Sequence, residues 1–272
     1  MASRLAIVTA TTNLDRAKIY LESWRETART GPSVLIVVNG GETGQPYLGT
    51  VPAFRQGVDA TLVHTDAEII CCFHDDLEIL EDGWDEKVLR LFDRVPACGL
   101  AGFGGALGLG DPHLYQKSYD PMQLARIMFR SNMVNAEMHG IRSLLTERVA
   151  CLDGFSQIGR REFWLGDRLD GRGRISPLSY RTSSDRQWTY LESLGVIHHF
   201  YDGMLGCLAK RHGWQAWYLP IRCDHHGGLT AVGDAGYQVW AKTKTEGGDH
   251  GFWEQAHRKS YEAFKDVLPI RI

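Results

Sequence analysis

Short apolar runs alternate with longer segments of mixed polarity through the first hundred residues. The runs at 5–8, 34–38 and 68–73 are bounded by polar residues or glycine, as is typical of short buried strands. The segments between them have helical spacing, with one helix beginning near Asn13 and the next covering 52–65. This alternation predicts a βαβαβ unit with a parallel sheet, in which ligands bind at the carboxyl ends of the strands.

The rest of the chain carries weaker signals of regular structure. Residues 106–185 mix glycine, arginine and aromatic residues without a clean period, which predicts long loops over a binding face. The regular elements expected around this stretch are a helix at 82–93, a strand at 98–105, a helix at 199–213, a strand at 215–223 and a closing helix at 252–267. We therefore expect one α/β domain in two halves, residues 1–105 and 106–232, followed by a C-terminal tail at 233–272.

Composition favours a globular protein that enters no membrane. With 272 residues, of which 43% are apolar, the chain can bury a full core. It has no run of eighteen apolar residues, and the apolar stretch at its amino terminus is too short for a signal peptide. Its six cysteines show no CxxC spacing, as expected of reduced thiols. We expect a soluble cytoplasmic protein, whose formal charge of -3 gives no broad attraction for nucleic acid.

Two adjacent carboxylates follow the third predicted strand. Asp75 and Asp76 come directly after the run that ends in Phe73 and His74. A hard divalent cation prefers oxygen ligands and shares its remaining positions with phosphate oxygens, so acids at a strand end suit a nucleoside diphosphate. Capping of the helix that follows explains the same two acids equally well.

A histidine pair lies in a glycine turn at the end of a later strand. His225 and His226 are followed by Gly227 and Gly228. Imidazole binds first-row cations such as Mn²⁺, and glycine lets a ligand approach the backbone closely. A paired histidine in a turn is also common as a plain surface feature.

The order of these features resembles that of the family 2 type of GT-A-fold glycosyltransferases, from Ala6 to Thr230. The segment 38–43 is similar to the family's strand-end segment that holds the donor base, and 74–76 resembles its metal-binding acid motif. The resemblance implies a Rossmann-like GT-A fold with a mostly parallel central sheet, flanking helices, a nucleotide-sugar-binding half and a loop-rich acceptor-binding and catalytic half. The donor-binding residues that it implies are Thr11, Asn39, Gly41, Arg55, Asp75, Asp76, Gly104 and Gly105.

Further segments resemble the family's functional motifs. The His-x-x-Gly-x-Thr turn at 225–230 looks like the one that completes the metal shell, which favours His225 over His226 as the partner of Asp76. The segment 199–202 is similar to the start of the helix whose leading acid is the catalytic base in inverting members, and Asp202 takes that position. The acceptor-binding residues that the resemblance implies are Asp153, Gly154, Trp164 and Tyr201.

The implied reaction is hexosyl transfer from a nucleotide-diphosphate sugar, carrying UDP or GDP, to an acceptor hydroxyl with inversion. A Mn²⁺ or Mg²⁺ ion would stabilise charge on the leaving diphosphate, and Asp202 would accept the proton of the hydroxyl. A small molecule, a glycan, a protein and a modified DNA base all remain open as acceptors. Two alternatives stay open: a non-catalytic sugar-binding module of the same fold, and a zinc-type metallohydrolase. The hydrolase would use His74, Asp75, Asp76, His225 and His226.

Overall fold

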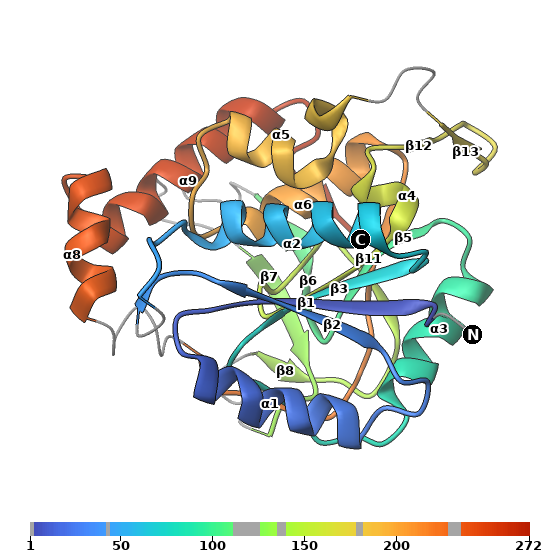
Figure 1. Cartoon of the computed structure of the whole chain (residues 1–272). Coiled ribbons are helices and arrows are strands. Elements are labelled where there is room, and N and C mark those ends of the chain that lie inside the picture. Colours follow the sequence, from blue (N-terminus) through green and yellow to red (C-terminus); the bar gives the residue numbers. More distant parts are fainter. Residues whose placement is uncertain (1–2, 42–43, 111–125, 135–139, 178–181, 228–234) are drawn as a thin grey trace.

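A central sheet of seven strands organises the protein (Figure 1). The computed structural model describes residues 3–41, 44–110, 126–134, 140–177, 182–227 and 235–272. The strand order is β2-β1-β3-β11-β5-β14-β9. The bounds are β1 Leu5–Thr11, β2 Ser33–Val38, β3 Ile69–His74, β5 Cys98–Gly102, β9 Glu147–Val149, β11 Ser156–Arg160 and β14 Gln215–Tyr218.

Five of these strands run in one direction, as the βαβαβ pattern predicts. Strand β1 pairs in parallel with β2 and β3, and β14 pairs in parallel with β5. Strand β11 is antiparallel to both β3 and β5, and β9 is antiparallel to β14. The sheet is therefore mixed but mostly parallel, and strands from both halves of the sequence enter it.

Helices cover both faces of the sheet (Figure 1). Alternate residues of β1 point to opposite faces: Val8 packs in the core beside α2, whereas Leu5 and Ile7 pack in the core beside α1 and α3. Helices α1 and α3 therefore cover one face, and α2, α5 and α6 cover the other. The bounds are α1 Leu14–Glu26, α2 Thr50–His64, α3 Trp84–Arg94, α4 Arg161–Trp164, α5 Gln187–Ser193 and α6 Tyr201–Arg211.

The described parts of the stretch 106–185 contain short strands between their loops, which the sequence pattern did not predict. They supply most of a second sheet, two strands of the main sheet, and a small hairpin. The additional strands are β6 Gly104–Leu109, β7 Arg126–Ser131, β8 Ile141–Arg142, β10 Cys151–Leu152, β12 Arg168–Leu169 and β13 Ile175–Ser176.

Strand β11 explains why the pattern misled. Its sequence has one large apolar residue, Ile158, although the strand lies in the centre of the sheet. Gly159 makes room for an aromatic ring, because a Cβ there would lie 2.3 Å from Trp164 Cε2. A neighbouring ring thus fills the space that an apolar side chain of the strand would ordinarily occupy.

The end of the chain forms two helices, where only one was expected. Helix α8 spans Ala235–Lys244 and α9 spans Gly248–Phe264, after which β16 (Ile270–Arg271) pairs with β6. The predicted strand at 215–223 divides into β14 and β15 (Cys223–His225), and β15 pairs with β4 (Leu77–Ile79). In the described residues, no helix has the length and apolar character to span a bilayer.

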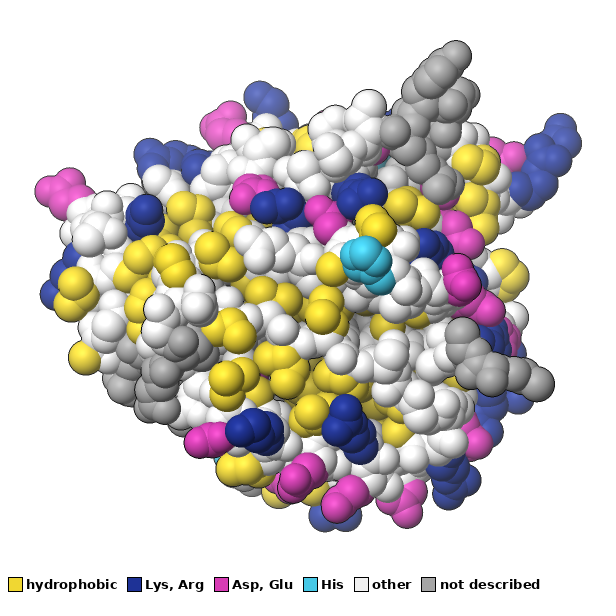
Figure 2. All heavy atoms as spheres, viewed as in Figure 1, with side chains coloured by type: hydrophobic (Ala, Val, Ile, Leu, Met, Phe, Trp, Pro, Cys, Tyr) yellow, Lys and Arg dark blue, Asp and Glu magenta, His cyan; other side chains and the backbone are white. Residues whose placement is uncertain are grey.

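The face drawn in Figure 2 has no patch of a single charge. Hydrophobic side chains cross its middle, where β2 forms the open edge of the sheet, and acidic and basic side chains are interspersed around the margin (Figure 2).

Candidate functional site

A cavity of about 250 Å³ lies at the carboxyl ends of β1, β2 and β3. Thr12 follows β1, Asn39 follows β2, and His74 ends β3, and all three line it. The remaining walls come from distant segments, including Tyr201 of α6 and Tyr237 of α8. The cavity is therefore where a mostly parallel α/β sheet ordinarily binds its ligand.

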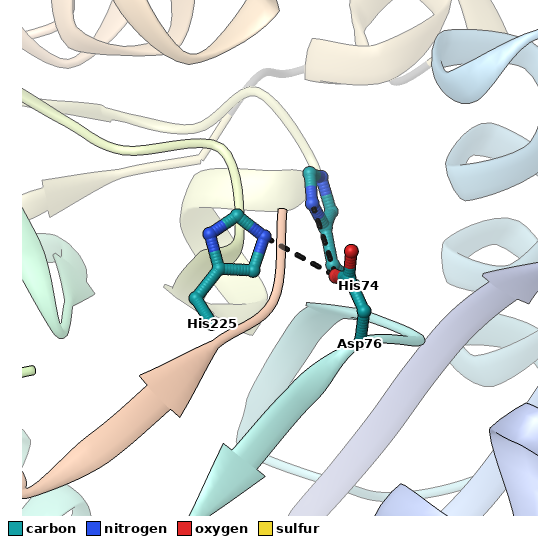
Figure 3. Close-up of side chains that lie close together, drawn as sticks. All are labelled: His74, Asp76 and His225. Carbon is teal, nitrogen blue, oxygen red and sulfur yellow. Dashed lines mark ion pairs between the residues drawn. The ribbon is translucent and has the colours of Figure 1, made fainter. Parts of the chain in front are cut away.

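Three side chains converge in this cavity (Figure 3). His225 Nε2 lies 3.2 Å from Asp76 Oδ1, and His74 Nδ1 lies 4.0 Å from the same oxygen. One candidate ligand atom of each residue lies within 4.8 Å of the others. We call His74, Asp76 and His225 the first cluster. Two imidazoles and a carboxylate form a donor set that suits a divalent first-row cation.

Backbone pairing brings the distant members of the first cluster together. Strand β15 runs antiparallel to β4, which places His225 opposite Leu77, and the amide of His226 donates to the carbonyl of Asp76. His225 also stacks on Phe155, with ring centroids 4.7 Å apart. The segments that carry Asp76 and His225 are thus joined by the pairing of β4 with β15, which fixes the separation of the two residues.

Charge and burial set the protonation of the first cluster. Burial opposes the negative charge on Asp76, but the hydrogen bond from His225 and the nearby imidazoles outweigh it, so the pKa of Asp76 is lowered. Burial lowers the pKa of His74, whereas Asp76 raises the pKa of His225 against the effect of burial. An ionised Asp76 and a neutral His74 are the forms that bind a cation.

Tyr201 orients His74. Its hydroxyl donates to the carbonyl of Gly154 at 3.1 Å and lies 2.6 Å from His74 Nε2. Because a hydroxyl has a single proton, Tyr201 accepts the proton on Nε2, and the lone pair of His74 is then on Nδ1, the nitrogen nearer Asp76. Metal-binding histidines are commonly held this way through their other nitrogen.

The structure separates His226 from the first cluster. Its side chain is 41% exposed and lies 3.8 Å from Glu78, whereas the side chain of His225 is 10% exposed and lies beside Asp76. His74, which the family resemblance did not assign as a ligand, takes the third position in the cluster. Its place at the end of a buried strand was the available signal. Residues 228–230 of the predicted turn lie outside the described residues.

Asp75 lines the cavity but is held by other protein groups. Its Oδ2 receives hydrogen bonds from the Thr11 hydroxyl and from the Arg16 guanidinium, the latter at 2.7 Å. Burial raises the pKa of Asp75, and the charge of Arg16 opposes that rise. The hydrogen bond from Thr11 therefore fixes the side chain of Asp75, which lines the cavity beside the first cluster.

Asn39 shapes the loop that follows β2. Its Oδ1 accepts hydrogen bonds from the backbone amides of Leu48 and Gly49, at 2.7 and 3.2 Å, and the residue lines the cavity. Gly41 adopts a left-handed conformation, with φ of 63°, in the turn beyond it. Arg55 forms ion pairs with Asp59 and Glu192 and is not among the residues that line the cavity.

The glycines predicted to admit the donor sugar contribute to packing. A Cβ on Gly104 would lie 3.0 Å from the rings of Phe129 and Phe155, and one on Gly105 would lie 3.0 Å from the carbonyl of Cys151. Both glycines are buried in β6 and do not line the cavity. Gly105 lies against β10, and Gly104 makes room for the two rings.

Of the predicted acceptor residues, Tyr201 lines the cavity, whereas Asp153, Gly154 and Trp164, like the predicted base Asp202, are not among its lining residues. Gly154 lies beside the cavity residue Tyr201, since a Cβ on it would be 2.6 Å from the Tyr201 hydroxyl and 3.2 Å from Asp202 Oδ2. Asp202 is buried, and its Oδ1 accepts from the amide of Gly203 at 2.7 Å. Asp153 adjoins Gly154, and its charge acts on His225.

Trp164 is a core residue. Its indole is 1% exposed, donates to the carbonyl of Ile70 and stacks on Trp188 with ring centroids 5.7 Å apart. The structure therefore does not bring Trp164 to the cavity. The aromatic residues at the cavity wall are Tyr47, Phe54, Tyr201 and Tyr237.

A second group of side chains has the composition to hold a metal ion and adjoins the same cavity, and the sequence did not reveal it. One candidate ligand atom from each of His198, His199 and Asp249 lies within 4.8 Å of the others, and both histidines line the cavity. We call these three residues the second cluster. The hydrogen bond from His199 lowers the pKa of Asp249 to about 2, and burial lowers the pKa of His198 well below its ordinary value.

Comparison with known structures supports the fold. GalNAc-T7 with UDP, GalNAc and Mn²⁺ matches 98% of this chain at 9% identity with a TM-score of 0.51, and the match covers 56% of that chain. The likeness is one of fold. A197 from STIV matches 80% of this chain and 82% of its own at 9% identity, with a TM-score of 0.39. No family model and no curated protein sequence matches the chain.

Proposed function

We propose that this protein transfers a sugar from a nucleotide-diphosphate sugar to an acceptor hydroxyl with the help of a divalent cation. The observation that carries the proposal is the convergence of His74, Asp76 and His225 at the carboxyl ends of the strands. The fold, which is like that of a glycosyltransferase whose structure contains UDP and Mn²⁺, gives independent support.

The first cluster is the proposed cation site. Its donor set fits Mn²⁺ or Mg²⁺ bound together with phosphate oxygens, because three protein ligands leave positions open in the coordination shell. The chemistry that such a cation supplies when bound is stabilisation of the negative charge on a departing diphosphate.

The donor nucleotide is proposed to extend from the first cluster towards Asn39. Asn39 and Thr12 line the cavity at the ends of β2 and β1. The ion pair with Arg16 fixes the side chain of Asp75, which also lines the cavity. Thr11 and Gly41 support this wall indirectly, through Asp75 and through the turn after β2. Binding of UDP or of GDP distinguishes a uracil base from a guanine base.

Asp202 is the proposed catalytic base. Its carboxylate and the Tyr201 hydroxyl both lie beside Gly154, and that hydroxyl lies 2.6 Å from His74 Nε2 of the first cluster. Asp202 itself is buried one residue behind Tyr201, which lines the cavity. A proton from an acceptor hydroxyl bound beside Gly154 would pass to this carboxylate as the oxygen attacks the sugar. Asp202→Asn should abolish sugar transfer while the affinity for the nucleotide changes by less than about threefold, since the substituted group contacts no donor atom in this scheme.

A metallohydrolase is the second candidate, because two histidines and a carboxylate are also a common ligand set of catalytic zinc. The two functions differ in what they bind. A hydrolase of this type needs no nucleotide, whereas the transferase should bind UDP or GDP more tightly when Mn²⁺ is present.

Nucleotide-linked thermal stability tests the proposal. UDP and GDP, with and without Mn²⁺, are added to the full chain, and the favoured nucleotide at 100 times its Kd should raise Tm by about 5 °C or more. His225→Ala should remove this rise, and His226→Ala is the matched control that should keep it. Equal shifts in the two variants, or no shift with either nucleotide, would refute the assignment.

A further inference from the structure

The second cluster joins segments that are distant in sequence. His198 and His199 lie directly before α6, and Asp249 lies in the first turn of α9. The carboxylate oxygen Oδ1 of Asp249 lies 2.7 Å from His199 Nε2. The contact therefore fastens the C-terminal helices to the wall of the main cavity.

Backbone strain places the two imidazoles. His199 and Phe200, with φ of 53° and 51°, are the non-glycine residues with positive φ in the described parts of the chain. A left-handed conformation costs a residue with a side chain about 1–2 kcal/mol. It also folds neighbouring side chains together, and the rings of His198 and His199 lie with their centroids 4.3 Å apart. Strain of this kind concentrates at functional sites.

Outer contacts hold two members of the second cluster, Asp249 and His198. The Tyr237 hydroxyl donates to Asp249 Oδ1 at 2.6 Å, and His198 Nδ1 lies 2.6 Å from the Thr50 hydroxyl. Thr50 begins α2, where the amide of Val51 donates to the carbonyl of Ile197 at 3.0 Å. Such contacts to carboxylate and imidazole ligands are typical of metal centres, where they fix the orientation of each ligand.

We propose that His198, His199 and Asp249 bind a second metal ion, a transition-metal ion of the Zn²⁺ type. Ligand atoms around tetrahedral Zn²⁺ stand roughly 3.3 Å apart, given metal–ligand distances near 2.0 Å. His199 Nε2 and Asp249 Oδ1 lie 2.7 Å apart and all candidate atoms lie within 4.8 Å of one another, so the observed separations bracket that spacing. The ion clamps α9 against the loop before α6 and leaves a coordination position open towards the cavity.

This proposal goes beyond sugar transfer and does not depend on it. The two clusters draw on different residues, so each can be removed while the other is kept. A hydrogen-bonded pair of His199 and Asp249, without a metal, is the competing explanation of the same geometry.

Zinc stoichiometry distinguishes these explanations. The metal-depleted full chain is dialysed against Zn²⁺, and the bound metal is counted for the wild type, Asp249→Asn and His225→Ala. We expect two bound ions in the wild type and one in each of the two variants. The Zn²⁺ affinity of the altered site should fall by more than about 100-fold, because even the outer contacts of a metal site contribute 10–100-fold to affinity. His250→Ala is the matched control, since this neighbour of Asp249 has an exposed side chain and should keep both ions.

A second variant guards against misfolding of Asp249→Asn. His199→Asn removes an imidazole but keeps a residue type that tolerates the left-handed conformation. It should also bind one ion, with an unchanged far-UV circular dichroism spectrum. Two ions retained in both variants, or one ion in the wild type that only His225→Ala removes, would overturn the proposal. One ion in the wild type that only Asp249→Asn removes would support it and count against the first cluster instead.

Discussion

The two clusters have the same donor set but are built in different ways. The first cluster is placed by regular structure: His74 ends β3, Asp76 follows it, and His225 ends β15. The second is placed by a strained loop and by the start of α9. Their burial differs accordingly, since the side chain of Asp76 is 7% exposed and that of Asp249 is 30% exposed.

This difference teaches how each site obtains its precision. The backbone hydrogen bonds between strands fix the positions of the strand ends, so the residues of the first cluster are placed without a strained backbone. The second cluster depends on the packing of α8 and α9, where Tyr237 and Phe252 form a small separate core with Ala241. Disturbing the C-terminal helices should therefore affect the second cluster and spare the first.

The largest expected effect is that of removing the charge of Asp76, the carboxylate to which both histidines of the first cluster lie close. Asp76→Asn should weaken Mn²⁺-linked nucleotide binding by more than about 100-fold, because it removes the charged ligand. Isothermal titration calorimetry with UDP and GDP measures this loss. Asp249→Asn should leave the nucleotide affinity within about threefold of the wild type; a comparable loss in both variants would mean that the two clusters form one coupled site.

A smaller effect is expected for the hydroxyl that orients His74. Tyr201→Phe should lower the Mn²⁺ affinity of the first cluster by about 10–100-fold, since it removes an outer contact and keeps the ring. The ring still packs on Phe54 and Trp188. Competition with a fluorescent chelator measures the Mn²⁺ affinity, and an unchanged value would show that Tyr201 does not position His74.

The difference in free energy of unfolding between a glycine and an alanine variant should have opposite signs at His199 and at His74, because the two residues have different backbone conformations. His199→Gly should be more stable than His199→Ala by about 1–2 kcal/mol, because glycine tolerates positive φ. At His74, which lies in a strand, the glycine variant should be less stable than the alanine variant by about 0.5–1 kcal/mol. Urea denaturation gives the free energies of unfolding, and the same sign at both positions would contradict the strain at His199.

The smallest expected effect concerns the outer contact of the second cluster. Tyr237→Phe should lower the free energy of unfolding by about 0.5–1.5 kcal/mol, the usual contribution of one hydrogen bond. Tyr261→Phe, at a half-buried position of α9, is the control and should change it by less than about 0.5 kcal/mol, because the substitution keeps the ring that packs against the core. Equal losses would indicate that the Tyr237 hydroxyl does not stabilise Asp249.

The sequence by itself determined the parallel core and pointed to two of the three members of the first cluster, Asp76 and His225. The apolar runs of β1, β2 and β3 are bounded by polar residues, and the polar residues that follow parallel strands must meet at one edge of the sheet. That reason covers Asp76, which follows β3, but not His225, which ends β15 in a separate two-stranded sheet. The order of the motifs suggested that the two residues meet, and their side chains lie 3.2 Å apart, whereas His226 and Trp164 lie away from the cavity.

Only the tertiary structure decided the central position of β11 and the second cluster. Strand β11 carries no apolar period, because Trp164 fills the space beside Gly159. The second cluster requires a left-handed turn at His199 and a contact with Asp249, fifty residues further along the chain. Periodicity reports which face of an element is buried, but it carries no information about which distant element covers that face.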